Sequence, residues 1–266
     1  MTGAAAVGRI YRRRQQWGGL GIAVVLALTL GSAVFAQFDW IDGLTAFPKA
    51  WGWMAANFVP NARAWNDLSK ILLRLGETVV VSVMATTVAA VVSFLLAILG
   101  SKTTRFHPVA TGIVRAVASL GRNIPVVAWA MIFLLTFGQT FITGFLALFL
   151  ESMGFLTRSY LETVDEAASG PVEALRAAGT PWAPVVAHAV VPSVLPSLAS
   201  WMLFMLETNI RSATLVGLLT GTGIGFLFDL YYNSLNYPAA ALTTLAIVVV
   251  VLALEALSNA LRKVIV

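Results

Sequence analysis

Long hydrophobic runs separated by short polar segments dominate this chain of 266 residues. Six of the runs have the length of about 20 residues that a helix needs to cross a lipid bilayer. Their hydrophobicity is continuous rather than alternating, which predicts helices and not the strands of a membrane barrel. The predicted spans are residues 17–35, 72–99, 109–137, 141–160, 187–210 and 238–261. We expect Pro125 to kink the third span, because proline cannot donate the amide hydrogen bond of an inner helical turn.

The segments between the spans predict how the chain is organised. Arginines precede the first span as in a signal peptide, but the span is long and residues 33–36 form a poor cleavage site, so we expect a retained helix. Residues 37–70 mix charges with tryptophans and predict short amphipathic helices on the outer membrane surface. The glycine-rich residues 211–237 predict an irregular segment. The chain thus divides into an N-terminal helix with a periplasmic surface segment, 1–70, and a membrane domain, 71–263.

Composition agrees with an integral membrane protein. Hydrophobic residues make up 59% of the chain and charged residues 11%, against about 25% charged in soluble domains. There is no cysteine, and the histidines His107 and His188 lie far apart, so we expect no metal site. No lysine follows a glycine, which excludes a P-loop. We therefore expect no catalytic residue and no cofactor in this chain, and any ATP must be used by a partner.

The distribution of basic residues predicts the topology. Lys and Arg favour cytoplasmic loops, and six spans place both termini on one side. With the termini in the cytoplasm, that side holds Arg9, Arg12, Arg13, Arg14, Lys102, Arg105, Arg158, Arg176, Arg262 and Lys263. The other side holds only Lys49, Arg63 and Lys70. The membrane topology thus explains the net charge of +5 without nucleic-acid binding. The same topology places the polar segment 162–184 in the cytoplasm.

This polar segment carries the most specific pattern of the chain. Residues 173–179 read Glu-Ala-Leu-Arg-Ala-Ala-Gly, and nine residues later residues 189–192 read Ala-Val-Val-Pro. Pro171 is favoured in a first helical turn and Gly179 at a helix end. A second helix can begin after Pro181. We therefore expect a helix–turn–helix that lies on the membrane surface.

The pattern resembles the EAA loop of ABC importer permeases, in which Glu-Ala-Ala, three residues, Gly and nine residues precede Ile-x-Leu-Pro. Leu175, Ala189 and Val191 replace the second Ala, the Ile and the Leu. The resemblance implies an all-α membrane protein with the six-helix type I ABC importer permease fold, in the bacterial cytoplasmic membrane. It implies a coupling helix that docks on a cytoplasmic ATPase, formed by Glu173, Ala174, Leu175, Arg176 and Gly179. The alternative, an ordinary surface helix, would not require this spacing.

Further stretches resemble the phosphonate-type branch of these permeases. They are residues 122–125, 170–179 and 207–214 and the glycine-rich run 217–225, and the resemblance covers about residues 70–263. It implies import of phosphonate or a related phosphorus oxyanion with a periplasmic or lipid-anchored binding protein. It also implies a second permease subunit and two ATPase subunits that bind ATP and Mg²⁺. The branch usually has glycine where Thr220 and Thr222 stand, so the exact solute stays open.

Charged residues within the third predicted span are candidates for the translocation pathway. Ionisable groups inside a bilayer cost about 2.5–3.5 kcal/mol each at mid-helix, so they usually face the interior of a protein. Arg115, Ser119 and Arg122 are spaced to share one helical face, and Asn123 adjoins them. They predict a cationic lining for an anion pathway. The alternatives are that Arg115 reaches the cytoplasmic headgroups and that Arg122 is structural at the kink.

A second charged group lies near the end of the fifth predicted span. Glu207 and Arg211 are one helical turn apart, with Asn209 between them. We interpret Glu207 and Arg211 as a latch that breaks when the pathway opens, or alternatively as an ion pair that fixes the helix end. The candidate residues of the pathway or its gate are thus Arg122, Asn123, Glu207, Asn209 and Arg211.

Other functions leave different marks on a sequence. A permease for another small solute, such as an amino acid, would share the loop and differ in the substrate that its binding protein delivers. An ion-driven transporter or channel would work without an ATPase, and the loop spacing and the lack of an inverted repeat argue against it. A membrane enzyme would need a catalytic constellation, and none is visible in the sequence.

Overall fold

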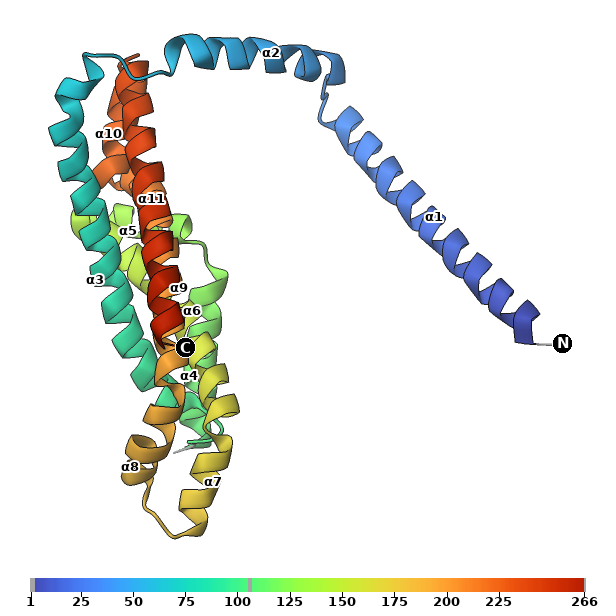
Figure 1. Ribbon diagram of the computed structural model, residues 1–266, viewed down its shortest axis with the longest axis vertical. Coiled ribbons are helices and arrows are strands. Elements are labelled where there is room, and N and C mark those ends of the chain that lie inside the picture. The colour runs from blue at the N-terminus through green and yellow to red at the C-terminus, as the bar shows by residue number, and fades with distance from the viewer. Residues whose placement is uncertain (1–2, 105–106, 266) are drawn as a thin grey trace. The chain divides into compact units, whose positions relative to one another are not determined.

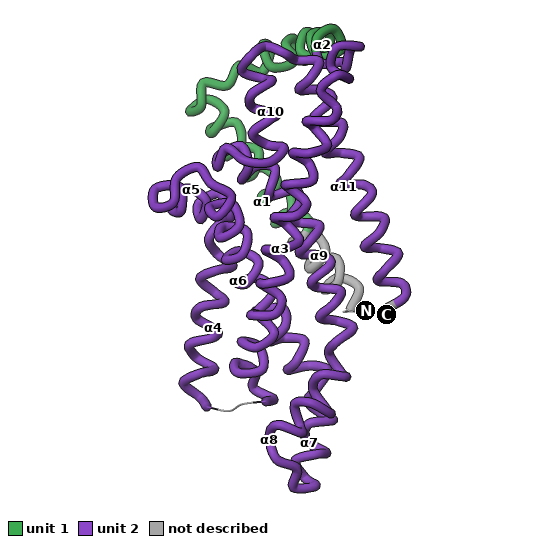
Figure 2. The backbone as a smooth tube through the Cα atoms, turned by 90° about the vertical axis from the view of Figure 1, so that its left-hand side faces the viewer, with its two compact units in different colours: residues 1–57 green, residues 58–266 purple. Residues whose placement is uncertain are grey.

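The computed structural model describes residues 3–104 and 107–265, and these residues form helices and short connections. The chain divides into two compact units, Met1–Asn57 and Phe58–Val266, which Figure 2 distinguishes by colour and which we call unit 1 and unit 2. The side chains of residues 1–14 and all of residues 105–106 lie outside the described part. Five arginines of the topology prediction therefore lie there: Arg9, Arg12, Arg13, Arg14 and Arg105.

Unit 1 consists of two helices, α1 (Gly3–Phe35) and α2 (Trp40–Asn57). The first predicted span lies within α1. The part of α1 from Gln15 to Phe35 is apolar and long enough to cross a membrane. Asp39 caps α2, because its Oδ1 accepts hydrogen bonds from the amides of Ile41 and Asp42 at 2.8 and 3.1 Å. That α2 lies on the outer membrane surface stays a prediction.

Unit 2 is a bundle of long helices with short helices at its two ends (Figure 1). Its helices are α3 (Leu68–Gly100), α4 (Pro108–Asn123), α5 (Val126–Phe137), α6 (Phe141–Ala167), α7 (Ser169–Ala177), α8 (Trp182–Val185), α9 (Val191–Thr220), α10 (Gly223–Asn233) and α11 (Tyr237–Ile265). A 3-10 turn, η1 (Ala64–Asp67), precedes α3, and a π-helical turn, η2 (Val186–Val190), precedes α9.

Helix α3 packs mainly against α6 and α9. Ala85, Ala89 and Ala97 of α3 are completely buried. Small residues allow membrane helices to approach closely, which gives the van der Waals contact that drives their association. Large apolar side chains on the outside of the bundle, such as Leu73 and Leu95 of α3, are exposed and are left for lipid or for a partner chain.

The number of membrane spans agrees with the sequence pattern. Five helical segments of the described residues are long and apolar enough to cross a membrane, and α4 with α5 makes a sixth if the pair is one span. This pair corrects the prediction of one kinked helix, because α4 and α5 are bent by 93° relative to each other (Figure 2). Ile124 and Pro125 both have extended backbones. The helical conformation is unfavourable for a residue that precedes proline, so α4 ends before Pro125 instead of continuing into α5.

The prediction that the glycine-rich residues 211–237 are irregular is wrong, because most of them are helical. Helix α9 continues to Thr220 and α10 follows after a two-residue turn. A Cβ on Gly225 would overlap the carbonyl oxygen of Thr214, so glycine is needed where α10 packs against α9. Gly221, at φ +67°, ends α9 in the left-handed conformation that favours glycine. Helix α6 likewise runs seven residues beyond its predicted end at residue 160, to Ala167.

Candidate functional site

Helix α7 contains the EAA-like residues and ends as its sequence predicts. Gly179 has a φ of +77°, and its amide donates to the carbonyl of Arg176 at 2.9 Å. The amide of Thr180 donates to the carbonyl of Leu175 at 3.1 Å. These two bonds form a Schellman motif, which satisfies the last carbonyls of a helix. Helix α8 begins at Trp182 after Pro181, so the two predicted helices and the turn between them are confirmed, and their position on the membrane surface stays a prediction.

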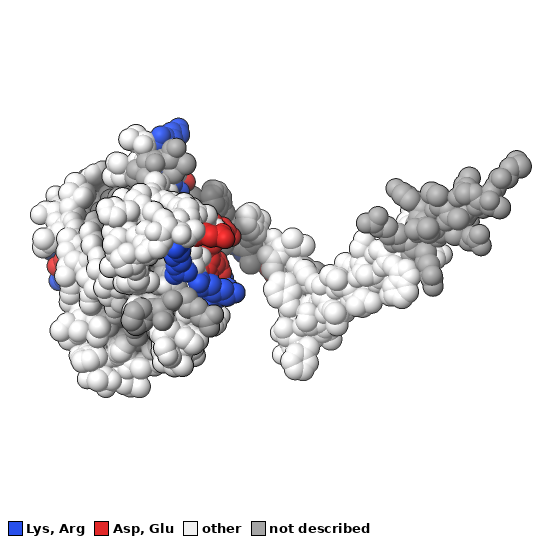
Figure 3. Space-filling view, turned by 90° about the horizontal axis from the view of Figure 1, so that it is seen from below, with Lys and Arg blue, Asp and Glu red and all other residues white. Residues whose placement is uncertain are grey.

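The motif residues divide between an anchored side and an exposed side of α7. Val172 is 2% exposed, and Leu175 packs against the buried core. Glu173, Ala174 and Arg176 are exposed. Figures 1 and 2 both place α7 and α8 at one end of unit 2, away from α10. In the view onto that end, charged side chains form a few small groups on an otherwise uncharged surface (Figure 3). A partner that binds α7 meets two exposed charged side chains, Glu173 and Arg176, beside the exposed Ala174.

The charged face of α4 is divided between two surroundings. Arg115 Nη2 lies 2.9 Å from Asp165 Oδ2 at the end of α6. Arg115 is therefore held by an ion pair between α4 and α6, and the sequence prediction missed Asp165 because the two are far apart in the chain. Asn123 Nδ2 donates to the carbonyl of Ser119 at 2.7 Å, which closes the end of α4. Arg122 is exposed, and no ion pair is found for it among the described residues.

Arg122 and Asn123 stand where α4 crosses α6 most closely. A Cβ on Gly154 of α6 would overlap the backbone of Gly121 and Arg122. The chain then turns at Ile124 into the broken joint before α5. Two backbones in direct contact fix the position of this joint, so the exposed side chains at the end of α4 extend from a rigid crossing.

The ion pair predicted on α9 is present, and it has a third member. Arg211 Nη2 lies 3.2 Å from Glu207 Oε1, and Arg262 Nη2 of α11 lies 4.0 Å from Glu207 Oε2. The Glu207 side chain is 12% exposed, whereas that of Arg211 is 51% exposed. The group has a net charge of +1. Sequence spacing reveals Arg211 and cannot reveal Arg262, because only the packing of α9 against α11 brings it near.

Asn209 lies on the buried side of α9. It has no solvent exposure, and its Nδ2 donates to Thr86 Oγ1 of α3 at 2.8 Å and to Ser152 Oγ of α6 at 2.7 Å. Ser82 Oγ lies 3.3 Å from its carbonyl oxygen. Asn209 thus joins three helices inside unit 2, and its side chain does not line a surface of that unit.

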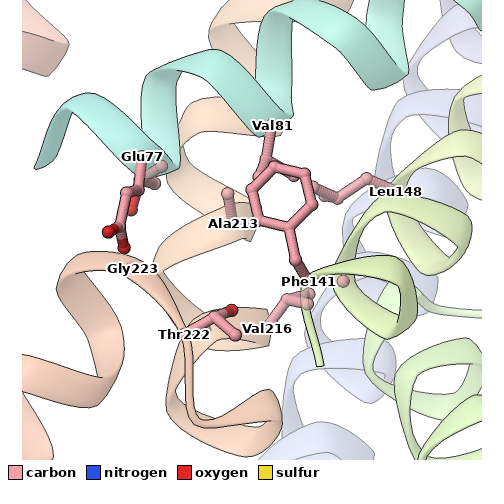
Figure 4. A pocket seen from close by; sticks show the side chains of 11 residues that line it. Glu77, Val81, Phe141, Leu148, Ala213, Val216, Thr222 and Gly223 are labelled. Carbon is pink, nitrogen blue, oxygen red and sulfur yellow. The ribbon is translucent and has the colours of Figure 1, made fainter. Parts of the chain in front are cut away.

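A small pocket lies among α3, α6 and the turn between α9 and α10 (Figure 4). Glu77 and Thr78 of α3, Phe141 of α6 and Thr222 of the turn contribute to its lining. Thr78 Oγ1 accepts a hydrogen bond from the amide of Ile224 at 2.9 Å, which fixes the start of α10. The ionisable lining residue, Glu77, is paired with Arg74, whose Nη1 lies 2.8 Å from Glu77 Oε2. No sequence pattern had marked it.

Comparison with known proteins places the chain in a family. Residues 89–266 match the family described as "Binding-protein-dependent transport system inner membrane component". The chain is 32% identical over 187 residues to the "Phosphite transport system permease protein PtxC" of Stutzerimonas stutzeri, which covers 70% of this chain and 68% of that protein. It is 31% identical over 199 residues to the "Phosphate-import permease protein PhnE" of Mycolicibacterium smegmatis. That match covers 75% of this chain and 37% of the mycobacterial protein.

Solved structures share the fold at low sequence identity. An inward-facing form of the MetNI methionine ABC transporter matches with a TM-score of 0.64 and 18% identity, over 74% of this chain and 96% of that one. A bacterial ABC transporter involved in the import of the acidic polysaccharide alginate matches with a TM-score of 0.61 and 12% identity, over 94% and 98%. The predicted all-α fold of an ABC importer permease is therefore confirmed. The chain is a multi-pass membrane protein that belongs to the family of binding-protein-dependent transport system inner membrane components.

Proposed function

We propose that this chain is the permease subunit of an ATP-driven importer that moves phosphonate or a related phosphorus oxyanion across the bacterial cytoplasmic membrane. The observation that carries the proposal is α7, an exposed helix with the EAA-like residues and a Schellman end, in a chain of a binding-protein-dependent transport family. The relatives named for phosphite transport and phosphate import support the class of solute. This chain itself catalyses no reaction in the proposal.

The coupling residues are Glu173, Ala174, Leu175, Arg176 and Gly179. The exposed side of α7 docks on a cytoplasmic ATPase, while Val172 and Leu175 anchor the helix to unit 2. A short helix with fixed ends suits this role, because rigid-body rotation of one subunit against another requires stiff contacts. Helix α8 and the turn η2 lead into α9, so the same element that meets the ATPase continues into the membrane.

The proposed assembly follows from this docking. Two ATPase subunits that bind ATP and Mg²⁺ hold two permease subunits, either two copies of this chain or one copy with a related chain. A periplasmic or lipid-anchored binding protein delivers the anion from the outside. The end with α7 and α8 faces the cytoplasm, as do both termini. ATP binding then draws the coupling helices together and opens the pathway outward.

The polar groups near the membrane interior have different proposed roles. Arg122 and Asn123 offer a guanidinium and an amide on the exposed end of α4, and guanidinium groups bind oxyanions through paired, charge-assisted hydrogen bonds. Glu207, Arg211 and Arg262 form the gate, since a net charge of +1 attracts an anion and Glu207 competes with it for the arginines. Asn209, being fully buried, supports this gate from within the bundle.

Uptake into proteoliposomes tests the proposal. The permease, reconstituted with its ATPase and binding protein, should import labelled phosphite, phosphonate or phosphate only when ATP is inside. Import of an amino acid and none of these anions would establish the alternative solute. Transport by the permease alone, driven by an ion gradient, would contradict the whole proposal.

Removing a gate arginine provides a second test. Arg211→Ala should lower uptake by about tenfold or more, because a lost charge-assisted hydrogen bond is worth about 1.5–3 kcal/mol. The matched control is Arg158→Gln, which removes an arginine whose ion-pair partner in the described part of the chain is Glu162, one turn away on α6. Unchanged uptake by Arg211→Ala in an intact complex would show that Arg211 has no part in the pathway.

A further inference from the structure

The connection between α3 and α4 begins with a rigid loop, residues 101–104. Ser101 is fully buried and Thr104 is 1% exposed. Ser101 Oγ accepts a hydrogen bond from the amide of Thr103 at 3.0 Å, and Thr104 Oγ1 donates to the carbonyl of Ile98 at 2.5 Å. Buried polar groups that are satisfied in this way hold a loop in one conformation. A movement imposed on the loop is therefore passed on rather than absorbed.

Asp165 binds this loop to α4. Its Oδ1 accepts from Ser101 Oγ at 2.6 Å and from the amides of Lys102 and Thr103 at 2.8 and 3.2 Å. Its Oδ2 accepts from Arg115 Nη2 at 2.9 Å. Hydrogen bonds between charged partners are about twice as strong as neutral ones. One carboxylate at the end of α6 thus connects three elements.

A second contact binds the same loop from the other side of α7. Trp182 Nε1, at the start of α8, donates to the carbonyl of Thr104 at 2.8 Å. Asp165 lies just before α7, and Trp182 lies just after its Schellman end. Both ends of the coupling helix are therefore attached to residues 101–104. We call these contacts the Asp165 clasp: Asp165 and Trp182 with residues 101–104, and Asp165 with Arg115.

Helix α4 connects the clasp to the candidate pathway. At one end a Cβ on Gly100 would lie 2.6 Å from Val114 Cγ1, so the end of α3 and α4 are in close contact. At the other end α4 crosses α6 at Gly121 and presents Arg122 before the break to α5. A displacement of α7 thus has a continuous, well-packed route to Arg122.

We propose that Asp165 is a positioning residue that makes α4 move with the coupling helix, so that ATPase movement reaches the broken α4–α5 span as well as α9. The inference rests on the proposed function and adds a second route of coupling to it. The EAA-like residues alone lead through α8 and η2 into α9. The clasp carries the same movement to the opposite side of the bundle, where Arg122 and Asn123 lie.

A merely structural role for Asp165 predicts a different behaviour. If the clasp only stabilises the fold, its loss lowers import and ATP hydrolysis together. If the clasp transmits movement, its loss leaves hydrolysis in place and reduces the import that each cycle achieves. The side chains of Arg115 and Asp165 are 27% and 24% exposed, so water can reach the partner that a substitution of either one leaves behind.

The experiment measures ATP hydrolysed per anion imported, in proteoliposomes that contain the complete transporter and the binding protein. Coupling free energies between sites usually correspond to factors of about 5–150, and we expect Asp165→Ala to raise this ratio by about tenfold. Arg115→Gln, which removes the ion pair with α4, and Trp182→Phe, which removes the hydrogen bond from Nε1 to the carbonyl of Thr104, should each raise it by a smaller factor. Asp165→Asn keeps acceptors for the loop and should lie between Asp165→Ala and the wild type.

The matched control is Glu162→Gln. It breaks the Arg158–Glu162 pair of 2.6 Å, which lies one turn from Asp165 but joins only residues of α6. Its ratio should equal that of the wild type. A wild-type ratio in Asp165→Ala, or an equal loss of import and hydrolysis in Asp165→Asn and Arg115→Gln, would overturn the inference. Failure of the proposed function is distinct, because the wild-type transporter would then import no phosphorus oxyanion.

Discussion

The middle and the last turn of α6 hold their neighbours by different means. In the middle, Gly154 brings the backbone of α6 against that of α4, and Ser152 accepts a neutral hydrogen bond from fully buried Asn209. In the last turn, Asp165 holds α4 and a loop through a charged group that is 24% exposed. The first region has no space to rearrange, whereas in the second the Arg115–Asp165 pair is partly open to water. Backbone contact thus fixes the crossing, and a partly exposed ion pair makes the connection beside the coupling helix.

The largest effect should follow from disturbing the fixed crossing. In Gly154→Val the new side chain would overlap the backbone of Gly121 and Arg122. Overpacking costs about 1–3 kcal/mol where neighbouring side chains can move aside. Here the neighbour is backbone, which cannot move aside, so we expect a loss of stability of at least about 3 kcal/mol. The melting temperature in detergent measures it. Gly112→Val, where a Cβ on α4 meets nothing within 4 Å, is the matched control. Equal melting temperatures for the two variants would contradict a tight crossing.

A smaller loss should follow from removing the neutral hydrogen bonds in the middle of the bundle. Asn209→Ala deletes two bonds between helices, and such bonds inside membranes average about 0.6 kcal/mol with a maximum near 1.7. We expect the free energy of unfolding to fall by about 1–2 kcal/mol in a titration with denaturing detergent. Thr208→Ala is the control, because among the described residues the Thr208 hydroxyl bonds only to the carbonyl of Phe204 in its own helix. A loss no larger than that of Thr208→Ala would remove Asn209 from the fixed region.

The smallest change in stability should come from the clasp. Asp165→Asn keeps hydrogen-bond acceptors and loses a partly exposed ion pair, and such pairs are worth about 0–1 kcal/mol. Its unfolding free energy should therefore stay close to that of Glu162→Gln, although its ATP consumption per imported anion rises. A loss of stability as large as that of Asn209→Ala would show that both regions of α6 are rigid supports.

The sequence predicted those features that depend on neighbours in the chain. The helix stop at Gly179, the new helix after Pro181 and the Glu207–Arg211 pair all arise from contacts within one or two turns. The resemblance carried by residues 173–192 was enough for the family and the fold. Hydrophobic length likewise predicted the spans, because the bilayer sets a minimum for each.

Features that depend on how helices pack were not accessible in the same way. Asp165 and Arg262 lie far along the chain from their partners Arg115 and Glu207, so no spacing rule could pair them. The glycine-rich stretch suggested an irregular segment, because glycine disfavours helices when nothing else is known. Its glycines instead allow α9 and α10 to touch, and packing outweighs propensity. Pro125 predicted the correct position of the bend, but a kink within one helix was expected, and the observed bend between α4 and α5 is 93°.

A photo-cross-link from α7 to the ATPase tests most directly whether α7 is the coupling helix. A photoreactive amino acid at Ala174, on the exposed side of α7, should cross-link to the ATPase subunit in membranes that contain the complete transporter. The same amino acid at Asn233, which is exposed at the end of α10, should not. If α7 is the coupling helix, we expect a cross-link from position 174 alone. A cross-link from position 233 with none from 174 would contradict both the topology and the coupling role of α7.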